Sequence, residues 1–226
     1  MTERPRVAGL VAAAGQGTRL AAGPKAFVTI GDRSLLQWAV ASLLGEVDEI
    51  VVAVAGDDVA RARAQVPGVR VVAGAESRQQ TVACLLGATE ARYVLVHDAA
   101  RPFLPTAVAR RVLDAAREVG AATAALPLAD TIVDAESGET VPRERLRAVQ
   151  TPQAFERALL LLAHERAAAD GVEATDDAAL VRRLGRPVRL VEGSALLHKI
   201  TTPEDLRLAS ALEALWLEQR SHGALP

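Results

Sequence analysis

Short apolar segments alternate with helical segments along most of this chain, and this alternation limits its fold more than any other feature. Strands are expected at Val7–Ala13, Glu49–Val54, Val69–Val72, Tyr93–His97, Ala121–Leu126 and Val188–Val191. Helices are expected at Leu35–Leu44, Asp58–Gln65, Gln79–Gly87, Thr106–Val119, Ala154–Asp170, Asp177–Leu184 and Pro203–Gln219. Strands separated by helices tend to pair in parallel, with helices packed on both faces of the sheet. The sequence therefore predicts an α/β fold, a mostly parallel twisted sheet flanked by helices.

The segment Leu10–Lys25 begins as an apolar strand and continues as a loop of small residues that contains Gly15 and Gly17. Small residues let the backbone approach a ligand closely, and free N–H groups in such a loop can line an anion site. Arg19 and Lys25 add full positive charges beside these amides. Neither the dinucleotide motif G-x-G-x-x-G nor the P-loop motif G-K-[ST] is complete here. The loop suits a nucleoside triphosphate; the alternative is an ordinary strand-to-helix turn with two solvated surface charges.

A second candidate site lies where the apolar run Tyr93–Val96 ends. This run is typical of a buried parallel strand, and open α/β sheets bind ligands beyond the carboxyl ends of their strands. Asp98 stands at that point. Its carboxylate is a suitable Mg²⁺ ligand, because Mg²⁺ prefers hard oxygen donors and is commonly shared with substrate phosphates. The alternative is that Asp98 caps a turn and pairs with Arg101, and His97 is expected to be packed rather than to bind a ligand.

Residues Thr131–Val149 interrupt the alternation of strands and helices. This segment is polar and places the turn residues Glu136–Glu139 between short β-branched pieces, which is typical of a protruding hairpin. A two-stranded ribbon is not stable alone, so we expect it to pack on something else; the alternative is a loose surface loop. The sequence shows no internal repeat, low-complexity tract or long linker. Residues 1–226 are therefore expected to form one domain with an arm at 131–149.

The composition narrows the class of protein. A net charge of −2 over 226 residues suggests no general attraction to nucleic acid or to membranes. No apolar run has membrane length and no secretory signal is evident, so a cytoplasmic protein is expected. The single cysteine, Cys84, excludes an internal disulfide and fits a reducing compartment, and its apolar helical surroundings predict a buried thiol. The two lysines, Lys25 and Lys199, stand in motifs of a chain that otherwise uses arginine.

Several segments together resemble one enzyme family. A-A-G-x-G-T-R-L at 13–20, followed by P-K at 24–25, is similar to the signature loop of nucleotidyltransferases that activate sugars or polyols. H-D-A-A-R-P at 97–102 resembles the metal-binding strand of the 2-C-methyl-D-erythritol 4-phosphate cytidylyltransferases. Further matches follow in order over nearly the whole chain, at 74–82, 129–131, 150–153, 175–177 and 199–206. The resemblance implies a single-domain, Rossmann-like nucleotidyltransferase fold. It also implies transfer of CMP from CTP to 2-C-methyl-D-erythritol 4-phosphate, giving 4-diphosphocytidyl-2-C-methyl-D-erythritol and pyrophosphate, in isoprenoid precursor biosynthesis by the non-mevalonate pathway.

The resemblance further implies roles for individual residues. Arg19 and Lys25 are expected to act on the α-phosphate and the departing pyrophosphate, and Asp98 to hold Mg²⁺. The expected acceptor-binding residues are Arg101, Thr131, Arg143, Thr151 and Lys199. The expected nucleotide-binding residues are Ala13, Ala14, Gly15, Gly74, Ala75, Glu76, Thr81 and Ala99. Because the arm embraces a second subunit in this family, the resemblance also implies a homodimer in which Arg143 reaches the neighbouring site.

The implied chemistry explains why the sequence carries no Ser–His–Asp or Cys–His motif. A phosphomonoester is already anionic at neutral pH, so it can attack CTP without a general base, and the protein supplies positioning and charge stabilisation. One departure from the family stands at Leu196–His198, where Leu197 replaces the usual asparagine. It keeps open a cytidylyltransferase for another polyol phosphate, such as ribitol 5-phosphate. A guanylyl- or uridylyltransferase and a non-catalytic nucleotide-binding regulator are two further candidates, and the combination of Arg19, Lys25 and Asp98 argues against the regulator.

Overall fold

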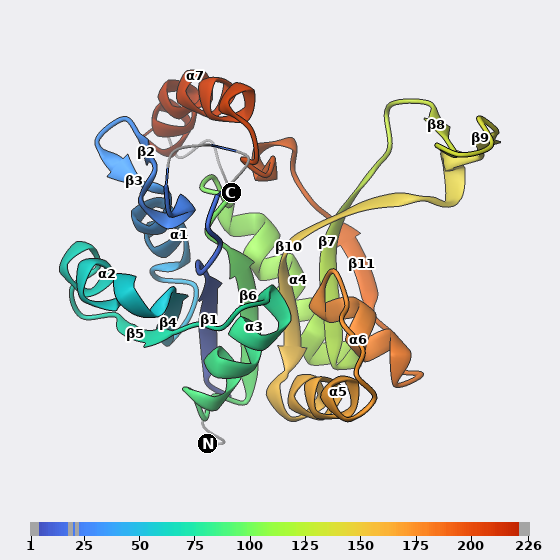
Figure 1. Ribbon diagram of the computed structural model, residues 1–226, viewed down its shortest axis with the longest axis horizontal. Helices are drawn as coiled ribbons and strands as arrows, with labels where there is room; N and C mark the ends of the chain where they lie inside the picture. Colours follow the sequence, from blue (N-terminus) through green and yellow to red (C-terminus); the bar gives the residue numbers. More distant parts are fainter. Residues whose placement is uncertain (1–4, 18–19, 21–22, 222–226) are drawn as a thin grey trace.

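A seven-stranded sheet with the order β11-β7-β10-β6-β1-β4-β5 forms the centre of the computed structural model, which describes residues 5–17, 20 and 23–221 (Figure 1). The strands are β1 (Val7–Ala12), β4 (Glu49–Val54), β5 (Arg70–Ala73), β6 (Tyr93–Asp98), β7 (Ala121–Pro127), β10 (Arg147–Glu156) and β11 (Arg189–Glu192). Neighbouring strands pair in parallel except at β10, which is antiparallel to both β6 and β7. The predicted mostly parallel α/β sheet is confirmed.

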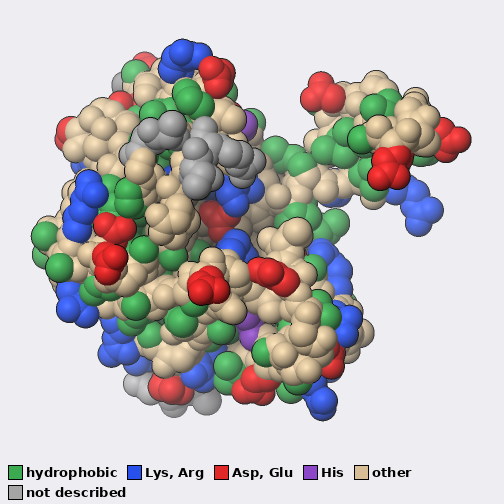
Figure 2. Space-filling view, in the orientation of Figure 1, with side chains coloured by type: hydrophobic (Ala, Val, Ile, Leu, Met, Phe, Trp, Pro, Cys, Tyr) green, Lys and Arg blue, Asp and Glu red, His purple; other side chains and the backbone are tan. Residues whose placement is uncertain are grey.

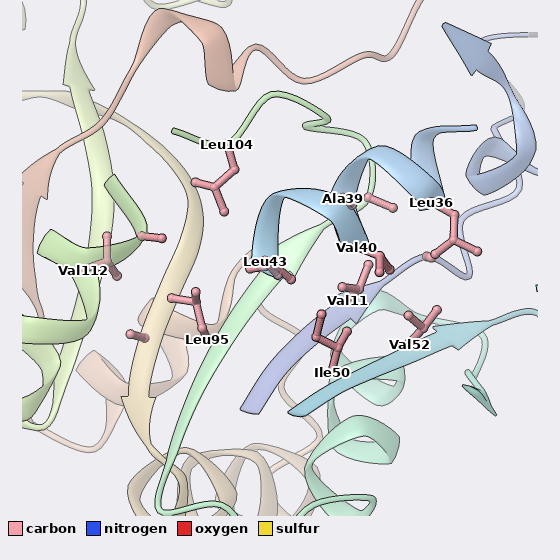
Figure 3. Packing of buried hydrophobic residues seen from close by; sticks show 14 of the residues in the cluster. Val11, Leu36, Ala39, Val40, Leu43, Ile50, Val52, Leu95, Leu104 and Val112 are labelled. Carbon is pink, nitrogen blue, oxygen red and sulfur yellow. The ribbon is translucent and has the colours of Figure 1, made fainter. Parts of the chain in front are cut away.

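Helices cover both faces of this sheet (Figure 1). They are α1 (Leu35–Leu43), α2 (Val59–Gln65), α3 (Arg78–Gly87), α4 (Thr106–Val119), α5 (Arg157–Ala169), α6 (Asp177–Arg183) and α7 (Pro203–Ser221). Successive residues of β1 point to opposite faces: Val11 packs with α1, α2 and α4, and Leu10 packs with α3, α5 and α6. Figure 3 shows the first of these clusters, in which Val11 and Val52 lie beneath Leu36 and Val40 of α1. Burial on both faces explains the continuous apolar runs that the sequence analysis assigned to strands.

A third, smaller cluster joins α7 to the body. Trp38 and Phe103 have ring centroids 5.6 Å apart, and the Phe103 and Trp216 centroids are also 5.6 Å apart. Trp38 Nε1 donates to the Ile30 carbonyl at 3.1 Å, which ties in the small hairpin of β2 (Thr29–Ile30) and β3 (Arg33–Ser34). The segment that precedes α7 is fixed to the turn after β6 by a backbone hydrogen bond of 2.9 Å from Ile200 to the Ala100 carbonyl. These contacts bring Lys199 to the carboxyl end of β6.

The helix predicted over Ala154–Asp170 begins later than expected. Ala154 to Glu156 form the end of β10, and α5 starts at Arg157. Because β10 hydrogen-bonds to β6 on one side and β7 on the other, these pairings outweigh the local helical pattern. The register with β7 shifts between Val149 and Gln153, an irregularity of the kind that accommodates a proline inside a sheet.

The segment between β7 and β10 extends away from the body (Figure 1). Its two short strands, β8 (Ile132–Val133) and β9 (Thr140–Val141), pair with each other as an antiparallel ribbon. At the turn, the Asp134 carboxylate accepts hydrogen bonds from the backbone amides of Glu136 and Ser137 at 3.0 and 2.8 Å. The side chain of Val133 is largely exposed. We refer to residues 131–149 as the arm.

Among the described residues, no helix combines the length and the apolar character that a membrane span requires.

Cys84 is exposed on α3, so the expectation of a buried thiol is wrong. Its neighbours Val82 and Leu85 turn toward the sheet, and the helical period places Cys84 on the opposite, solvent-facing side.

Candidate active site

A pocket of about 270 Å³ lies at the carboxyl ends of β1 and β6, beside the first turn of α3. Its described lining residues are Ala12, Ala13, Ala14, Gly15, Gly17, Lys25, Ala26, Ala75, Glu76, Ser77, Arg78, Thr81, Asp98, Ala99, Ala100, Lys199 and Thr201. Figure 2 shows acidic and basic side chains close together in a recess near the middle of the view. The structure thus brings together most of the predicted nucleotide-binding residues with Lys25, Asp98 and Lys199.

The loop after β1 forms one wall of the pocket. It leaves the sheet through a hydrogen bond of 2.8 Å from the Ala13 amide to the Ala53 carbonyl. It returns where the Lys25 amide donates to the Gly15 carbonyl at 3.2 Å, at the start of a short 3-10 helix over Lys25–Phe27. This closure places the Lys25 side chain among the small residues of the loop. Arg19, the other predicted cation, lies outside the described residues.

The turn before α3 forms the opposite wall. Thr81 Oγ1 accepts a hydrogen bond from the Ala75 amide at 3.1 Å, and the Ser77 hydroxyl caps the helix in a capping box with Gln80. Gly74 lines a shallower recess that adjoins the pocket. A Cβ at Gly74 would lie 2.8 Å from the Ala14 Cβ and 3.0 Å from Thr81 Oγ1, so only glycine lets the two walls approach this closely.

Asp98 is the central charged group of the pocket, and its side chain is 9% exposed. Its Oδ1 accepts from Arg78 Nε at 3.0 Å, and its Oδ2 accepts from Lys199 Nζ at 2.7 Å. Burial alone would raise the pKa of Asp98, but the positive charges of Arg78 and Lys199 outweigh burial and hold the pKa well below its usual range. Arg101, the partner expected in the alternative interpretation of Asp98, donates its backbone amide to the Asp98 carbonyl at 3.0 Å, and its positive charge adds a smaller lowering of the Asp98 pKa.

Arg78 is a site residue that the sequence analysis did not assign. Its Nη1 donates to Asp177 Oδ2 at 2.8 Å, and Asp177 Oδ1 lies 3.1 Å from Nε2 of the buried His164. Burial acts to lower the pKa of Arg78, yet the carboxylates of Asp98 and Asp177 raise it above its ordinary value. A chain of paired groups, Asp98–Arg78–Asp177–His164, therefore runs from the pocket to α5. The available sequence signal was an arginine in the first turn of a helix, directly after the capping serine.

Two predicted acceptor-binding residues lie next to the pocket but not among its described lining residues. Thr151 on β10 is buried, and its hydroxyl accepts from the Asp98 amide at 3.1 Å. Arg101 donates from Nη1 to the Leu197 carbonyl. The side chain of Leu197 is fully buried in the core, so this departure from the family pattern places an apolar residue in the packing while its carbonyl faces Arg101.

The two remaining predicted residues are on the arm. Thr131 and Arg143 are exposed, and neither is among the described residues that line the pocket. Arg143 Nη1 donates to the Ala129 carbonyl at the base of the arm. Figure 1 shows the arm directed away from the body of its own chain.

Known proteins resemble this chain over nearly its whole length. A sequence profile of the 2-C-methyl-D-erythritol 4-phosphate cytidylyltransferase family matches residues 7–214. The chain belongs to this family. A cytidylyltransferase of that name from Deinococcus radiodurans is 58% identical over 215 residues, which cover 93% of this chain and 91% of that protein.

Solved structures agree with this assignment to the cytidylyltransferase family. The crystal structure of the cytidylyltransferase from Thermus thermophilus superposes with a TM-score of 0.82 and 46% identity, covering 92% of this chain and 98% of that one. The 4-diphosphocytidyl-2C-methyl-D-erythritol synthase of Anaerococcus prevotii gives a TM-score of 0.80 at 27% identity, covering 92% and 95%. These likenesses confirm the single-domain nucleotidyltransferase fold that the sequence predicted for a cytidylyltransferase of this family.

The pocket suits a metal ion that the nucleotide helps to bind. Among the described residues no three His, Cys, Asp or Glu side chains are grouped closely enough to hold a metal by themselves. Asp98 offers carboxylate oxygens toward the pocket. A single carboxylate together with substrate phosphates and water is a common ligand set for Mg²⁺. The residues present therefore fit Mg²⁺ carried by a triphosphate.

Proposed function

We propose that this protein transfers CMP from CTP to 2-C-methyl-D-erythritol 4-phosphate, releasing pyrophosphate. The observation that carries the proposal is the pocket itself, in which small-residue backbone, Lys25, Asp98 and Lys199 meet at the carboxyl ends of β1 and β6. An acceptor phosphate oxygen forms a bond to the α-phosphorus of CTP while the bond from that phosphorus to the β-phosphate oxygen breaks. The attacking phosphate is already anionic, so the reaction needs charge stabilisation and alignment rather than a general base.

The two walls of the pocket are suited to different parts of the nucleotide. The loop at Ala13–Gly15, together with Lys25, faces the triphosphate, because loop amides and an ammonium group both favour anions. The turn at Gly74–Glu76, held by Thr81, offers fixed backbone groups that can select the base and ribose. Rigid backbone groups reject a wrong base because a mispaired buried donor or acceptor is costly.

Lys199 and Arg101 stand on the side of the pocket where the acceptor phosphate is expected. Lys199 contacts Asp98 from the segment before α7, and Arg101 follows on the same turn as Asp98. Their positive charges would offset the repulsion between the acceptor phosphate and the triphosphate.

A pyrophosphate-release screen tests the reaction. CTP, UTP, GTP and ATP are each combined with 2-C-methyl-D-erythritol 4-phosphate and with ribitol 5-phosphate. We expect release only with CTP and the methylerythritol acceptor, and Lys25→Ala should lower kcat and kcat/KM together by about 10²-fold or more. Equal turnover with UTP or GTP, or faster turnover with ribitol 5-phosphate, would contradict the proposal.

We further propose that Asp98 holds Mg²⁺ with the triphosphate; bound there, the ion would neutralise and orient the phosphate oxygens. Removing the charge with Asp98→Asn should raise the Mg²⁺ concentration needed for half-maximal activity and weaken Mn²⁺ binding in the presence of CTP, followed by electron paramagnetic resonance. Glu76→Gln, which neutralises another carboxylate of the pocket, is the matched control and should leave the metal requirement unchanged. An unaltered metal titration for Asp98→Asn would show that Asp98 is not a ligand.

The arm supports a third proposal, that two copies associate and each lends Arg143 to the other's pocket. The arm projects from its own body and exposes Arg143, and two-fold homodimers are the commonest oligomers (Figure 1).

The exposed thiol of Cys84 fits a reducing compartment, and we propose that the dimer works in the cytoplasm.

Complementation tests the shared site. Arg143→Ala and Lys25→Ala chains, each expected to keep about a tenth or less of the wild-type activity, are mixed in equal amounts under conditions of subunit exchange. In a mixed dimer one site carries both lesions and the other is intact, so about a quarter of the wild-type activity should return. A mixture that exchanges subunits but stays inactive, or an active monomer, would overturn the proposal.

A further inference from the structure

The turn at Asp98–Arg101 carries charged groups for both substrates of the proposed reaction. Backbone hydrogen bonds hold its outer side: the Ala99 amide donates to the Ala12 carbonyl at 3.2 Å, and the Ile200 amide donates to the Ala100 carbonyl at 2.9 Å. The position of the Asp98 carboxylate relative to the Arg101 guanidinium depends on the shape of this turn. The groups that fix the turn from inside the protein therefore matter for the reaction.

His97 fills the inside of the turn and is completely buried. Its Nε2 lies 2.9 Å from the Arg101 carbonyl oxygen. A carbonyl oxygen only accepts hydrogen bonds, so Nε2 must carry the hydrogen. In the neutral ring Nδ1 is then left with a lone pair, and the hydroxyl of Thr151 lies 3.2 Å from it.

The Thr151 hydroxyl completes the arrangement. It accepts from the Asp98 amide at 3.1 Å, which leaves its own hydrogen to donate to His97 Nδ1. Each donor therefore meets an acceptor along the path from the Asp98 amide, through Thr151 and His97, to the Arg101 carbonyl. The path begins and ends on the backbone of the same turn, and Thr151 stands on β10, the strand that continues from the arm.

We propose that His97 and Thr151 are positioning residues, which clamp the Asp98–Arg101 turn from inside and so set the spacing between its carboxylate and its guanidinium. This inference deepens the proposed function and rests on it for the identity of the substrates. It changes the role of Thr151, which the family resemblance placed on the acceptor. Both hydrogen-bonding directions of the Thr151 hydroxyl are used inside the protein, and the residue is 4% exposed.

Substitutions of Thr151 and His97 test the hydrogen bonds of the proposed clamp. Thr151→Val removes the hydroxyl at constant shape, and Thr151→Ser retains it. His97→Gln keeps a donor toward the Arg101 carbonyl but removes the acceptor for Thr151. We expect Thr151→Val and His97→Gln each to lower kcat/KM for the acceptor by about tenfold, and Thr151→Ser to keep most of the activity. Thr123→Val, at a buried threonine of the adjacent β7, is the matched control for loss of a hydroxyl from the sheet.

The double variant decides between positioning and substrate contact. Both substitutions break the hydrogen bond between Thr151 and His97, and Thr151→Val also removes the acceptor of the Asp98 amide, so the double variant should lose little more activity than Thr151→Val alone. If Thr151 instead touches the acceptor, the two losses multiply and Thr151→Val alone raises KM for the acceptor. Multiplying losses would overturn the proposal, as would a Thr123→Val loss as large as that of Thr151→Val.

A spectroscopic measurement keeps the clamp testable without turnover. In the ¹⁵N NMR spectrum of the full chain, His97 should show a protonated Nε2 and a hydrogen-bonded, unprotonated Nδ1, and Thr151→Val should shift the Nδ1 signal. The opposite tautomer would refute the clamp. If the tautomer is as expected but the wild type releases no pyrophosphate from CTP and the methylerythritol acceptor, the proposed function fails and the clamp stands.

Discussion

The pocket in the body and the arm hold their charged groups in different ways. In the pocket, Asp98 and Arg78 are paired and largely buried, and Arg78 is paired again with the buried Asp177. On the arm, Arg143 is exposed and contacts the carbonyl of Ala129 at the arm's own base. The charges in the body are therefore held by oppositely charged partners within the chain, whereas Arg143 on the arm is exposed to solvent and contacts a backbone carbonyl.

This difference has consequences for stability and for catalysis. Groups fixed in advance in a site of low polarity cost no reorganisation during the reaction, which is the basis of electrostatic preorganisation. They also link the site to the core, since breaking a buried pair leaves an uncompensated charge. Substitutions in the body should therefore disturb folding and activity together, and substitutions on the arm should disturb activity alone.

The largest effect is expected from Arg78→Gln. The side chain of Arg78 is 26% exposed, and its loss leaves the carboxylates of Asp98 and Asp177 without their shared cation. We expect the free energy of unfolding to fall by about 3–5 kcal/mol, measured by urea denaturation at pH 7. Activity should fall as well, because the Asp98 carboxylate is no longer held in place.

Arg183→Gln is the matched control for this prediction. Arg183 lies on α6 close to Asp177 in sequence, and it pairs at 2.8 Å with Asp170, but both of these side chains are about half exposed. An exposed pair contributes at most about 1 kcal/mol, so this variant should unfold close to the wild type. Equal urea midpoints for the two variants would show that burial does not distinguish the pocket from the surface.

The pH dependence of stability should also come from the body. Burial lowers the pKa of His97 from 6.5 to about 4. Between these two pH values the unfolded chain therefore binds a proton on His97 and the folded chain does not. The stability that comes from keeping His97 neutral is fully present above pH 6.5 and is lost as the pH falls toward 4. The free energy of unfolding should fall by about 3 kcal/mol over this range. The arm, residues 131–149, contains no histidine, and its Asp134, whose pKa is lowered by the hydrogen bond from the Ser137 amide, titrates at lower pH than His97 does in the unfolded chain.

Urea midpoints between about pH 7.5 and 4.5 test this for the wild type and for His97→Asn. The wild type should lose stability toward low pH more steeply than the variant, because the variant has no imidazole to protonate at this position. Parallel curves would mean that His97 does not titrate differently in the folded and unfolded states.

The sheet could be predicted because its parallel strands carry the signal in their own residues. Runs such as Val7–Ala12 and Glu49–Val54 are buried on both faces and are therefore continuously apolar. The strand β10 has no such signal: a proline interrupts it, its last residues favour a helix, and its two neighbours in the sheet come from distant parts of the chain. The structure of β10 is decided by its pairing with β6 and β7, and the local sequence pattern carries no information about such long-range pairing.

In the pocket, too, residues of one contiguous motif could be predicted and contacts between distant parts of the chain could not. Residues within contiguous motifs, such as Ala13–Gly15 and Lys25, line the pocket together, because a short loop carries its own geometry. The partners Arg78 and Asp177 were not predicted, since their 2.8 Å contact joins positions 99 residues apart. Cys84 was misplaced for a related reason: its neighbours are apolar, but its own position on the helix faces solvent.

The smallest effect on folding and a large effect on activity are expected together from Arg143→Ala. Arg143 is exposed on the arm, so its loss leaves no buried group unpaired, and the urea midpoint should match that of the wild type. If the arm delivers this guanidinium to an acceptor phosphate, kcat/KM for the acceptor should fall by about 10- to 100-fold, as for one charge-assisted hydrogen bond, while KM for CTP stays unchanged. Arg145→Ala removes the same charge two residues away and should change neither quantity. An equal loss of activity in the two variants would mean that the arm acts through its overall charge. A lowered midpoint for Arg143→Ala would mean that the arm is bound into the folding unit, and the contrast with the pocket would then fail.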